Sequence, residues 1–148
     1  MRVVLDVNIL VRANERSAGL ARDLLRELLR QRATILISTE ILIELVRVLR
    51  YPRLQARYGF TETDIYEYIQ FLKNAGEFVV TDTSLSVPIR DAADIAVVQT
   101  AITGEAEFIC TVDTDFHEPL ITGFLGRAGI KVVNDIALMQ ILRALRGE

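Results

Sequence analysis

Four acidic residues are the part of this sequence with the most specific chemistry. Asp6 and Asp113 each follow an apolar segment of strand length, and Glu44 and Asp94 each lie inside an apolar pattern with helical spacing. Carboxylates that a fold brings to one place repel one another unless a cation neutralises them. If these four residues converge, they predict a site for a multivalent metal ion.

Asp6 and Asp113 follow predicted strands. Asp6 comes directly after Val3–Leu5, and Asp113 comes shortly after Phe108–Cys110. In an open α/β sheet, ligands bind outside the carboxyl ends of the strands, at the point where the strand order reverses. Each acid could instead be a turn former that binds local backbone groups. Two such acids, matched by two more inside helices, favour a shared site.

Glu44 and Asp94 each have a structural alternative. Glu44 interrupts an apolar helix, where an ionised carboxylate is costly unless it is paired or bound to a metal. Arg47, three residues later, could supply an ion pair, and the two roles are compatible. Asp94 lies one turn after Asp91, where both acids could simply stabilise the start of a helix. We interpret Asp91 as the helix cap and Asp94 as the candidate ligand.

The donor types limit the choice of metal. Carboxylate oxygens suit Mg²⁺ or Mn²⁺, and the absence of histidine and cysteine from the set argues against zinc. A dication held by acids at strand ends can activate water and neutralise the charge that develops on a phosphate. The predicted reaction is the hydrolysis of a phosphodiester bond.

Helical and strand-like segments alternate along the chain. Helix signals, among them caps at Ser38, Thr61, Asp91 and Asn134, separate the strand-like segments, and residues 123–126 contain a glycine pair that we assign to a loop. The predicted strands are 2–5, 34–38, 78–80, 108–111 and 130–133; the predicted helices begin near 20, 39, 53, 61, 92 and 134. This alternation, without period-2 polarity, predicts an α/β fold with a parallel sheet covered on both faces.

Composition sets further limits. The 148 residues, 51% of them hydrophobic, predict one ordered domain over residues 1–148. No segment approaches the roughly 20 apolar residues of a membrane span, and no secretory segment is recognisable. The single cysteine, Cys110, lies in a predicted buried strand and fits a reducing, cytoplasmic location. The net charge of −3 argues against a nucleic-acid partner, except that a metal at the four acids would remove this negative excess.

The acids lie in strings that resemble the PIN domain. The strings are Asp-Val-Asn-Ile-Leu-Val at 6–11, Arg-Asp-Ala-Ala-Asp at 90–94 and Thr-Val-Asp-Thr-Asp-Phe at 111–116, with Glu44 in the second predicted helix. Residues 44–54 are similar to the VapC-like branch of toxins in prokaryotic toxin-antitoxin modules. The resemblance spans the chain. It implies a three-layer α/β/α fold with a five-stranded parallel sheet and a metal-dependent endoribonuclease that acts on RNA.

The resemblance also assigns roles to individual residues. Asp6, Glu44, Asp94 and Asp113 match the acidic metal site of the family. A further acid, Asp115, and two supporting polar residues match as well. The two supporting residues are Asn8 and Thr111, which could equally be turn formers.

One position departs from the family pattern. Val7 stands where the family frequently has serine or threonine, so a hydroxyl that could support the polar network is missing. The lone His117 follows the last acidic string, but a loop histidine without a partner signal is more often simply exposed, and we give it no role.

The partners follow from the leading hypothesis, a ribonuclease that uses Mg²⁺ or Mn²⁺. All but two of the 17 lysines and arginines are arginine, which suits phosphate contacts. Solvated arginines are common, however, and a GC-rich coding sequence would also favour arginine. The resemblance implies a small antitoxin protein as partner and a homodimer. The candidates for contacts to RNA phosphates are Arg12, Arg16, Arg47 and Arg50.

Two other functions fit parts of the sequence. Val7 and the low positive charge also fit a catalytically silent PIN fold that binds RNA or a protein. An aspartate after the first strand fits a phosphatase of the haloacid-dehalogenase kind. That chemistry requires a second acid two residues later, where this chain has Asn8, and a later lysine, whereas only Lys73 and Lys131 are present.

Overall fold

Five parallel strands form the centre of the protein. The computed structural model describes all 148 residues. The strands are β1 (Arg2–Leu5), β2 (Thr34–Ile37), β3 (Glu77–Phe78), β4 (Phe108–Cys110) and β5 (Lys131–Val133), and their order in the sheet is β3-β2-β1-β4-β5. All four pairings are parallel, so the predicted α/β class with a five-stranded parallel sheet is confirmed.

Eight α-helices and one short 3₁₀ helix connect and follow the strands. Four of the helices begin at the predicted caps, where Ser38, Thr61, Asp91 and Asn134 accept hydrogen bonds from backbone N–H groups of the first turn. The helices are α1 (Val7–Arg12), α2 (Leu20–Arg30), α3 (Thr39–Leu49), α4 (Pro52–Tyr58), α5 (Glu62–Ala75), α6 (Ala92–Thr103), η1 (Thr114–His117), α7 (Pro119–Arg127) and α8 (Asp135–Leu145).

Three segments differ from the prediction by more than one residue at an end. Residues Val7–Arg12, expected in a loop, form α1, and residues 123–126, also expected in a loop, lie within α7. The third strand is Glu77–Phe78 rather than 78–80. Short helices and glycine-containing helices have weak local signals, and tertiary packing decides them.

Burial explains the two unexpected helices. In α1 the side chains of Ile9 and Leu10 are fully buried, and in α7 the side chains of Ile121 and Leu125 are buried. In α7 the burial of these apolar side chains offsets the helix-weakening effect of Gly123 and Gly126, about 1 kcal/mol each.

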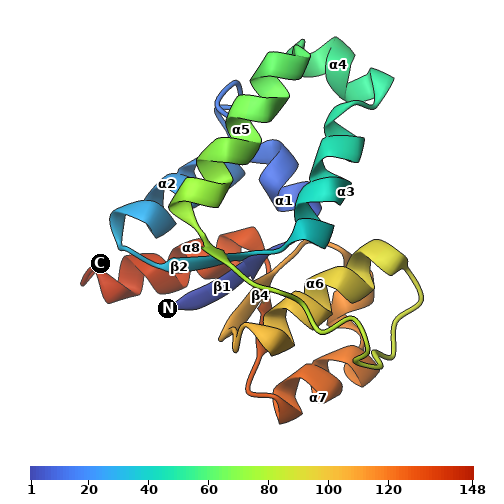
Figure 1. Cartoon of the computed structure of the whole chain (residues 1–148). Coiled ribbons are helices and arrows are strands. Elements are labelled where there is room, and N and C mark those ends of the chain that lie inside the picture. Colours follow the sequence, from blue (N-terminus) through green and yellow to red (C-terminus); the bar gives the residue numbers. More distant parts are fainter.

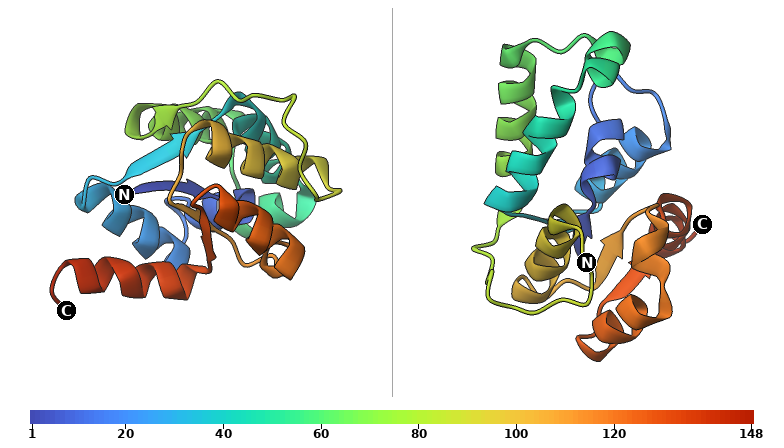
Figure 2. Two further views of the ribbon diagram at one scale, coloured as in Figure 1. Left: turned by 90° about the horizontal axis from the view of Figure 1, so that it is seen from below. Right: turned by 90° about the vertical axis from the view of Figure 1, so that its right-hand side faces the viewer.

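The central strands lie in the core. β1 and β4 are almost entirely buried, and Cys110 is buried in β4 as predicted. Helices α2 and α8 pack against each other on one side of the strands, and α6 packs on the other side against β1, β2 and β4 (Figure 2). Helices α3 and α5 run side by side and are joined at one end by α4 (Figure 1).

The sheet has its reversal point between β1 and β4. The chain passes from β1 to β2 and then β3 on one side of β1, and after α6 it returns to β4 and continues to β5 on the other side. Leu5 pairs with Cys110, so the residues that follow these two strands, Asp6 and Thr111, lie next to each other. Such a crevice is the usual ligand position in open α/β sheets.

None of the helices has the length and apolar character needed to span a lipid bilayer.

Candidate functional site

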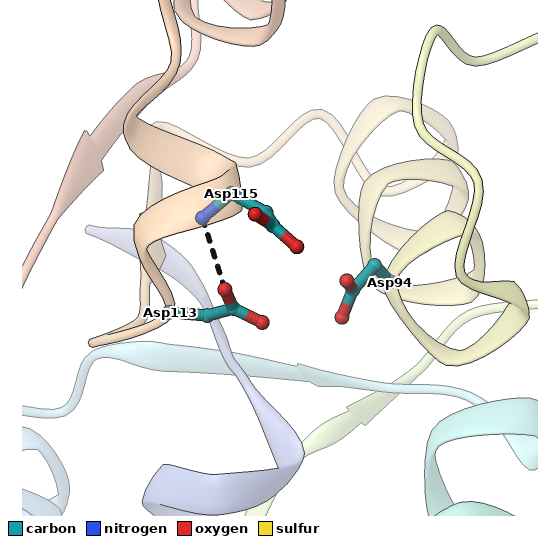
Figure 3. A group of neighbouring side chains, drawn as sticks. All are labelled: Asp94, Asp113 and Asp115. Carbon is teal, nitrogen blue, oxygen red and sulfur yellow. Dashed lines mark hydrogen bonds between the residues drawn. The ribbon is translucent and has the colours of Figure 1, made fainter.

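Three aspartates converge beyond the carboxyl end of β4. Asp94 in the first turn of α6 faces Asp113 and Asp115 in the segment after β4, and one carboxylate oxygen of each lies within 4.8 Å of the other two (Figure 3). Asp94 is buried, Asp113 is half-buried and Asp115 is exposed. The group therefore has a buried inner member and an outer member that solvent can reach.

Local hydrogen bonds fix where two of these aspartates stand. Asp91 caps α6 and accepts the backbone N–H groups of Ala93 and Asp94, which leaves the Asp94 carboxylate free of capping. Asp113 caps η1, and its Oδ1 accepts the N–H of Asp115 at 2.9 Å. Capping thus orients the backbone on both sides of the cluster.

Asp6 is linked to the cluster through Thr111. The Thr111 hydroxyl donates to Asp6 Oδ2 at 2.7 Å and accepts the N–H of Asp113 at 3.0 Å. The other oxygen of Asp6 accepts the N–H of Val7 at 2.8 Å. Asp6 is buried and Thr111 is fully buried, so the network is rigid and shielded from water.

The electrostatics of the site disfavour negative charge. Burial, and then repulsion from Asp91, Asp6, Asp113 and Asp115, raises the pKa of Asp94 to about 7. Burial is also the main cause of the raised pKa of Asp6, partly offset by the hydrogen bonds from Thr111 and Val7. No lysine or arginine forms a salt bridge with any of these acids. A cation bound here would relieve this repulsion.

Glu44 lies apart from the three converging aspartates. Its carboxylate is held by Arg47 in a two-pronged ion pair, with Arg47 Nε 2.9 Å from Oε2 and Nη2 bonded to Oε1. This is the ion pair that the sequence offered as an alternative. The helix that carries it is less buried than its composition predicts, since Ile43 is 63% exposed.

Asn8, His117 and Val7 differ in burial, and none of them bonds to the acids through its side chain. Asn8 is exposed, and its side chain makes no hydrogen bond to the acids. His117 is exposed, with its Nε2 3.2 Å from the carbonyl oxygen of Thr111. Val7 is buried in the core. A hydroxyl at the site does exist, but Thr111 supplies it.

Most of the arginines predicted to contact phosphate are bound by carboxylate or carbonyl groups of the protein itself. Arg16 binds the carbonyl oxygens of Tyr58 and Gly59 as well as the carboxylate of Asp64. Arg47 binds Glu44, and Arg50 forms a salt bridge with Glu62 at 2.7 Å. Only Arg12 retains a nitrogen, Nη2, that is buried without a partner.

Two further arginines, Arg53 and Arg57, were not predicted. They lie four residues apart on α4, next to Asn8 and Arg12, and neither forms a salt bridge. Their helical spacing was visible in the sequence, but only the fold brings them into one groove with Asn8 and Arg12 of α1.

The sequence profile of the PIN domain matches residues 2–115, more than three quarters of the chain. The chain belongs to the PIN domain family. No curated protein matches it in sequence. Among solved structures, it is similar to the crystal structure of VapBC2 from Rickettsia felis bound to a DNA fragment from its promoter. The TM-score is 0.58 and the identity 19%, over 90% of this chain and 98% of the other.

A second similar structure is FitAcB from Neisseria gonorrhoeae, with a TM-score of 0.48 and 14% identity over 90% of this chain and 97% of the other. At 19% identity the likeness to VapBC2 concerns the fold alone. The site of this PIN domain therefore has to be judged on its own residues.

The residues present fit a hard divalent cation. Asp94, Asp113 and Asp115 offer only carboxylate oxygens, and no histidine or cysteine side chain takes part in the group. Oxygen-only sites with one or two carboxylates and remaining water ligands are typical of Mg²⁺ and Mn²⁺.

Proposed function

We propose that this PIN domain is an endoribonuclease that requires Mg²⁺ or Mn²⁺ and acts as the toxin of a toxin-antitoxin pair. The observation that carries the proposal is the group of Asp94, Asp113 and Asp115, which meets at the reversal point of the sheet without a lysine or arginine to neutralise it. A fold retains such mutual repulsion only at a cost in stability, and a bound cation offsets that cost.

The acids have unequal roles in this proposal. Asp94, Asp113 and Asp115 would hold the cation, which when bound supplies water activation and neutralises charge on the phosphate. Asp6, fixed by Thr111 and the N–H of Val7, adds a further negative charge beside the cation. Through Thr111 it also holds the segment that carries Asp113. Glu44 completes the site only if Arg47 releases it, for instance to a phosphate of the substrate.

The raised pKa of Asp94 should make metal binding at this site depend on pH. With its pKa at about 7, this carboxyl is partly protonated at neutral pH, so metal binding there would release a proton. Asp115 is exposed and lets substrate phosphate and water reach the edge of the group.

Cleavage of a fluorescently labelled single-stranded RNA in Mn²⁺ tests the proposal. The wild-type protein, purified free of any partner, should cut it, and Asp113→Asn should not. Glu67→Gln, which removes an exposed charge on α5, is the matched control and should cut at the wild-type rate. A protein that binds this RNA but never cuts it, with Asp113→Asn unchanged in binding, would instead be the silent binding module.

A small antitoxin partner is part of the proposal. The similar Rickettsia structure is of VapBC2, bound to promoter DNA. Co-expression with the neighbouring short reading frame tests this point. A stable complex that no longer cuts RNA is expected, and failure to form any complex would contradict it.

A homodimer is the other proposed assembly. An apolar groove of about 640 Å³ lies between α3, α5 and β3, with Ile43 63% and Phe78 50% exposed beside it. Burial of such a surface against a second copy is favourable. Light scattering should give a dimer for the wild type and a monomer for Ile43→Asp. The control Leu120→Asp changes an equally exposed side chain on α7 and should leave the dimer intact.

A further inference from the structure

A groove beside the acidic group carries three arginines and no acidic side chain. It has a volume of about 380 Å³ and lies between α1 and α4. Its polar lining consists of Asn8, Arg12, Arg53 and Arg57 together with Tyr58. The hollow between α2 and α8 carries four arginines, but Asp23 and Glu27 lie among them, whereas this groove has no acid in its lining.

The guanidinium groups in this groove are largely free. Arg53 and Arg57 form no salt bridge and no hydrogen bond, and Arg57 lies over the ring of Tyr58 at 5.3 Å. Arg12 has one acidic neighbour, Asp135 at 3.7 Å, and its Nη2 is buried without a partner. By contrast, Arg16, Arg47 and Arg50 are all engaged by acids of the protein itself.

Two short stretches of chain link the lining of the groove to the acidic residues. Asn8 lies two residues after Asp6, and Val112, which also lines the groove, stands between Thr111 and Asp113. A strand of nucleic acid with a phosphate at the aspartates would therefore have its neighbouring backbone at the arginines.

The walls of the groove also fit a single strand rather than a duplex. Val48 and the ring of Tyr58 are half-buried and Val112 is 43% exposed, so together they provide surface against which unstacked bases can pack. Arginine side chains bind phosphate oxygens with two N–H groups at once, and Arg53 and Arg57, four residues apart, lie on the same face of α4.

We infer that Arg53 and Arg57, with Arg12, bind the phosphate backbone of single-stranded RNA on one side of the cleaved bond. This assignment rests on the proposed ribonuclease function. It names the part of the protein that holds the substrate, whereas the aspartates hold the reacting phosphate.

The test is the binding of a labelled single-stranded RNA by fluorescence anisotropy in EDTA at several salt concentrations. Arg53→Gln/Arg57→Gln should weaken binding roughly tenfold and lower the slope of log K against log salt by about 1.4, because each lost phosphate contact removes about 0.7. The matched control is Arg26→Gln/Arg143→Gln, which removes two exposed, unpaired arginines from α2 and α8 and should bind as the wild type does.

Cleavage in Mn²⁺ separates this inference from the proposed function. If the wild type and both double variants cut RNA with the same kcat/KM and bind it equally, the groove assignment fails while the ribonuclease function stands. If no protein cuts RNA but the Arg53/Arg57 variant alone loses RNA binding, the function fails and the groove assignment stands.

An acidic peptide serves as the competing ligand. If a labelled decaglutamate peptide binds the wild type and not Arg53→Gln/Arg57→Gln, while RNA binding is unchanged, the groove is a peptide site and the inference is overturned. Equal RNA binding by all variants at every salt concentration would overturn it as well.

Discussion

Glu27 and Asp94 are buried to nearly the same extent, 7% and 8% exposed, but their surroundings are opposite. Glu27 on α2 accepts hydrogen bonds from Arg30 at 2.6 Å, from Arg146 and from Gln31. The Asp94 carboxylate accepts no hydrogen bond, and its nearest charged neighbours are other aspartates. The same protein thus satisfies one buried carboxylate completely and leaves the other in repulsion.

This difference distinguishes an acid that supports the fold from the acids that we propose bind a metal ion. A buried ionised group without a partner lowers stability, so its neighbours normally supply a partner, as they do for Glu27. The group around Asp94 has no such partner within the chain, and a metal ion from solution would take that place.

RNA cleavage should show the largest difference between the two acids. Asp94→Asn removes a proposed metal ligand and should lower kcat/KM by about a thousandfold. Glu27→Gln keeps the size and part of the hydrogen bonding, and should cut within about twofold of wild type once its folding has been checked by circular dichroism. Equal activity of wild type and Asp94→Asn would remove the distinction.

In urea unfolding the ranking should be the opposite: substitution of Glu27, not of Asp94, should cause the larger loss in the free energy of unfolding. Glu27→Ala leaves Arg30 and Arg146 without their shared partner and should lower the free energy of unfolding by about 2 kcal/mol, because these arginines are partly exposed. Asp94→Asn in the metal-free protein should raise it at pH 8. If Asp94→Asn is as harmful as Glu27→Ala in EDTA, Asp94 is a structural acid.

The pH dependence of this gain follows from the raised pKa of Asp94. The folded carboxyl holds its proton up to about pH 7, whereas the unfolded one releases it near 3.8, so the folded state binds more protons between these values. The stability that this proton contributes is present below pH 3.8 and is lost as the pH rises through 7. The free energy of unfolding of Asp94→Asn should therefore equal that of the wild type at pH 3.5 and exceed it by about 1 kcal/mol at pH 8, measured by urea titration in EDTA. A difference in free energy of unfolding that grows toward low pH would contradict the raised pKa of Asp94 as its cause.

Glu44 should show the smallest effect. Since Arg47 holds its carboxylate, Glu44→Gln should lower the affinity for Mn²⁺ by less than about threefold, compared with more than tenfold for Asp94→Asn. Isothermal titration of both variants measures the difference. A loss for Glu44→Gln as large as that for Asp94→Asn would show that Arg47 releases Glu44 to the metal.

Local signals in the sequence predicted much of the fold. Ser38, Thr61, Asp91 and Asn134 cap helices as predicted, since a cap requires only its own turn. The helices α1 and α7 were missed, because α1 is only six residues long and α7 contains Gly123 and Gly126. Both depend on burial against the rest of the protein.

For the site, the sequence predicted the residue types better than their partners. It placed Asp94 and Asp113 at the ends of elements that meet, and it offered the Glu44–Arg47 pair because those residues are three apart on one helix. It named Asp115 only through the family resemblance, and it could not show that Arg146 pairs with Glu27, since that contact arises from tertiary packing. Nor could it separate the free arginines Arg53 and Arg57 from the occupied ones.

The most direct test of the metal site is the titration of Mn²⁺ into the purified, metal-free protein and into Asp113→Asn, followed by calorimetry. The wild type should bind Mn²⁺ and release protons at pH 7, in line with the raised pKa of Asp94, and Asp113→Asn should bind at least about tenfold more weakly. Binding of equal strength in both proteins, or no binding to the wild type, would contradict the account.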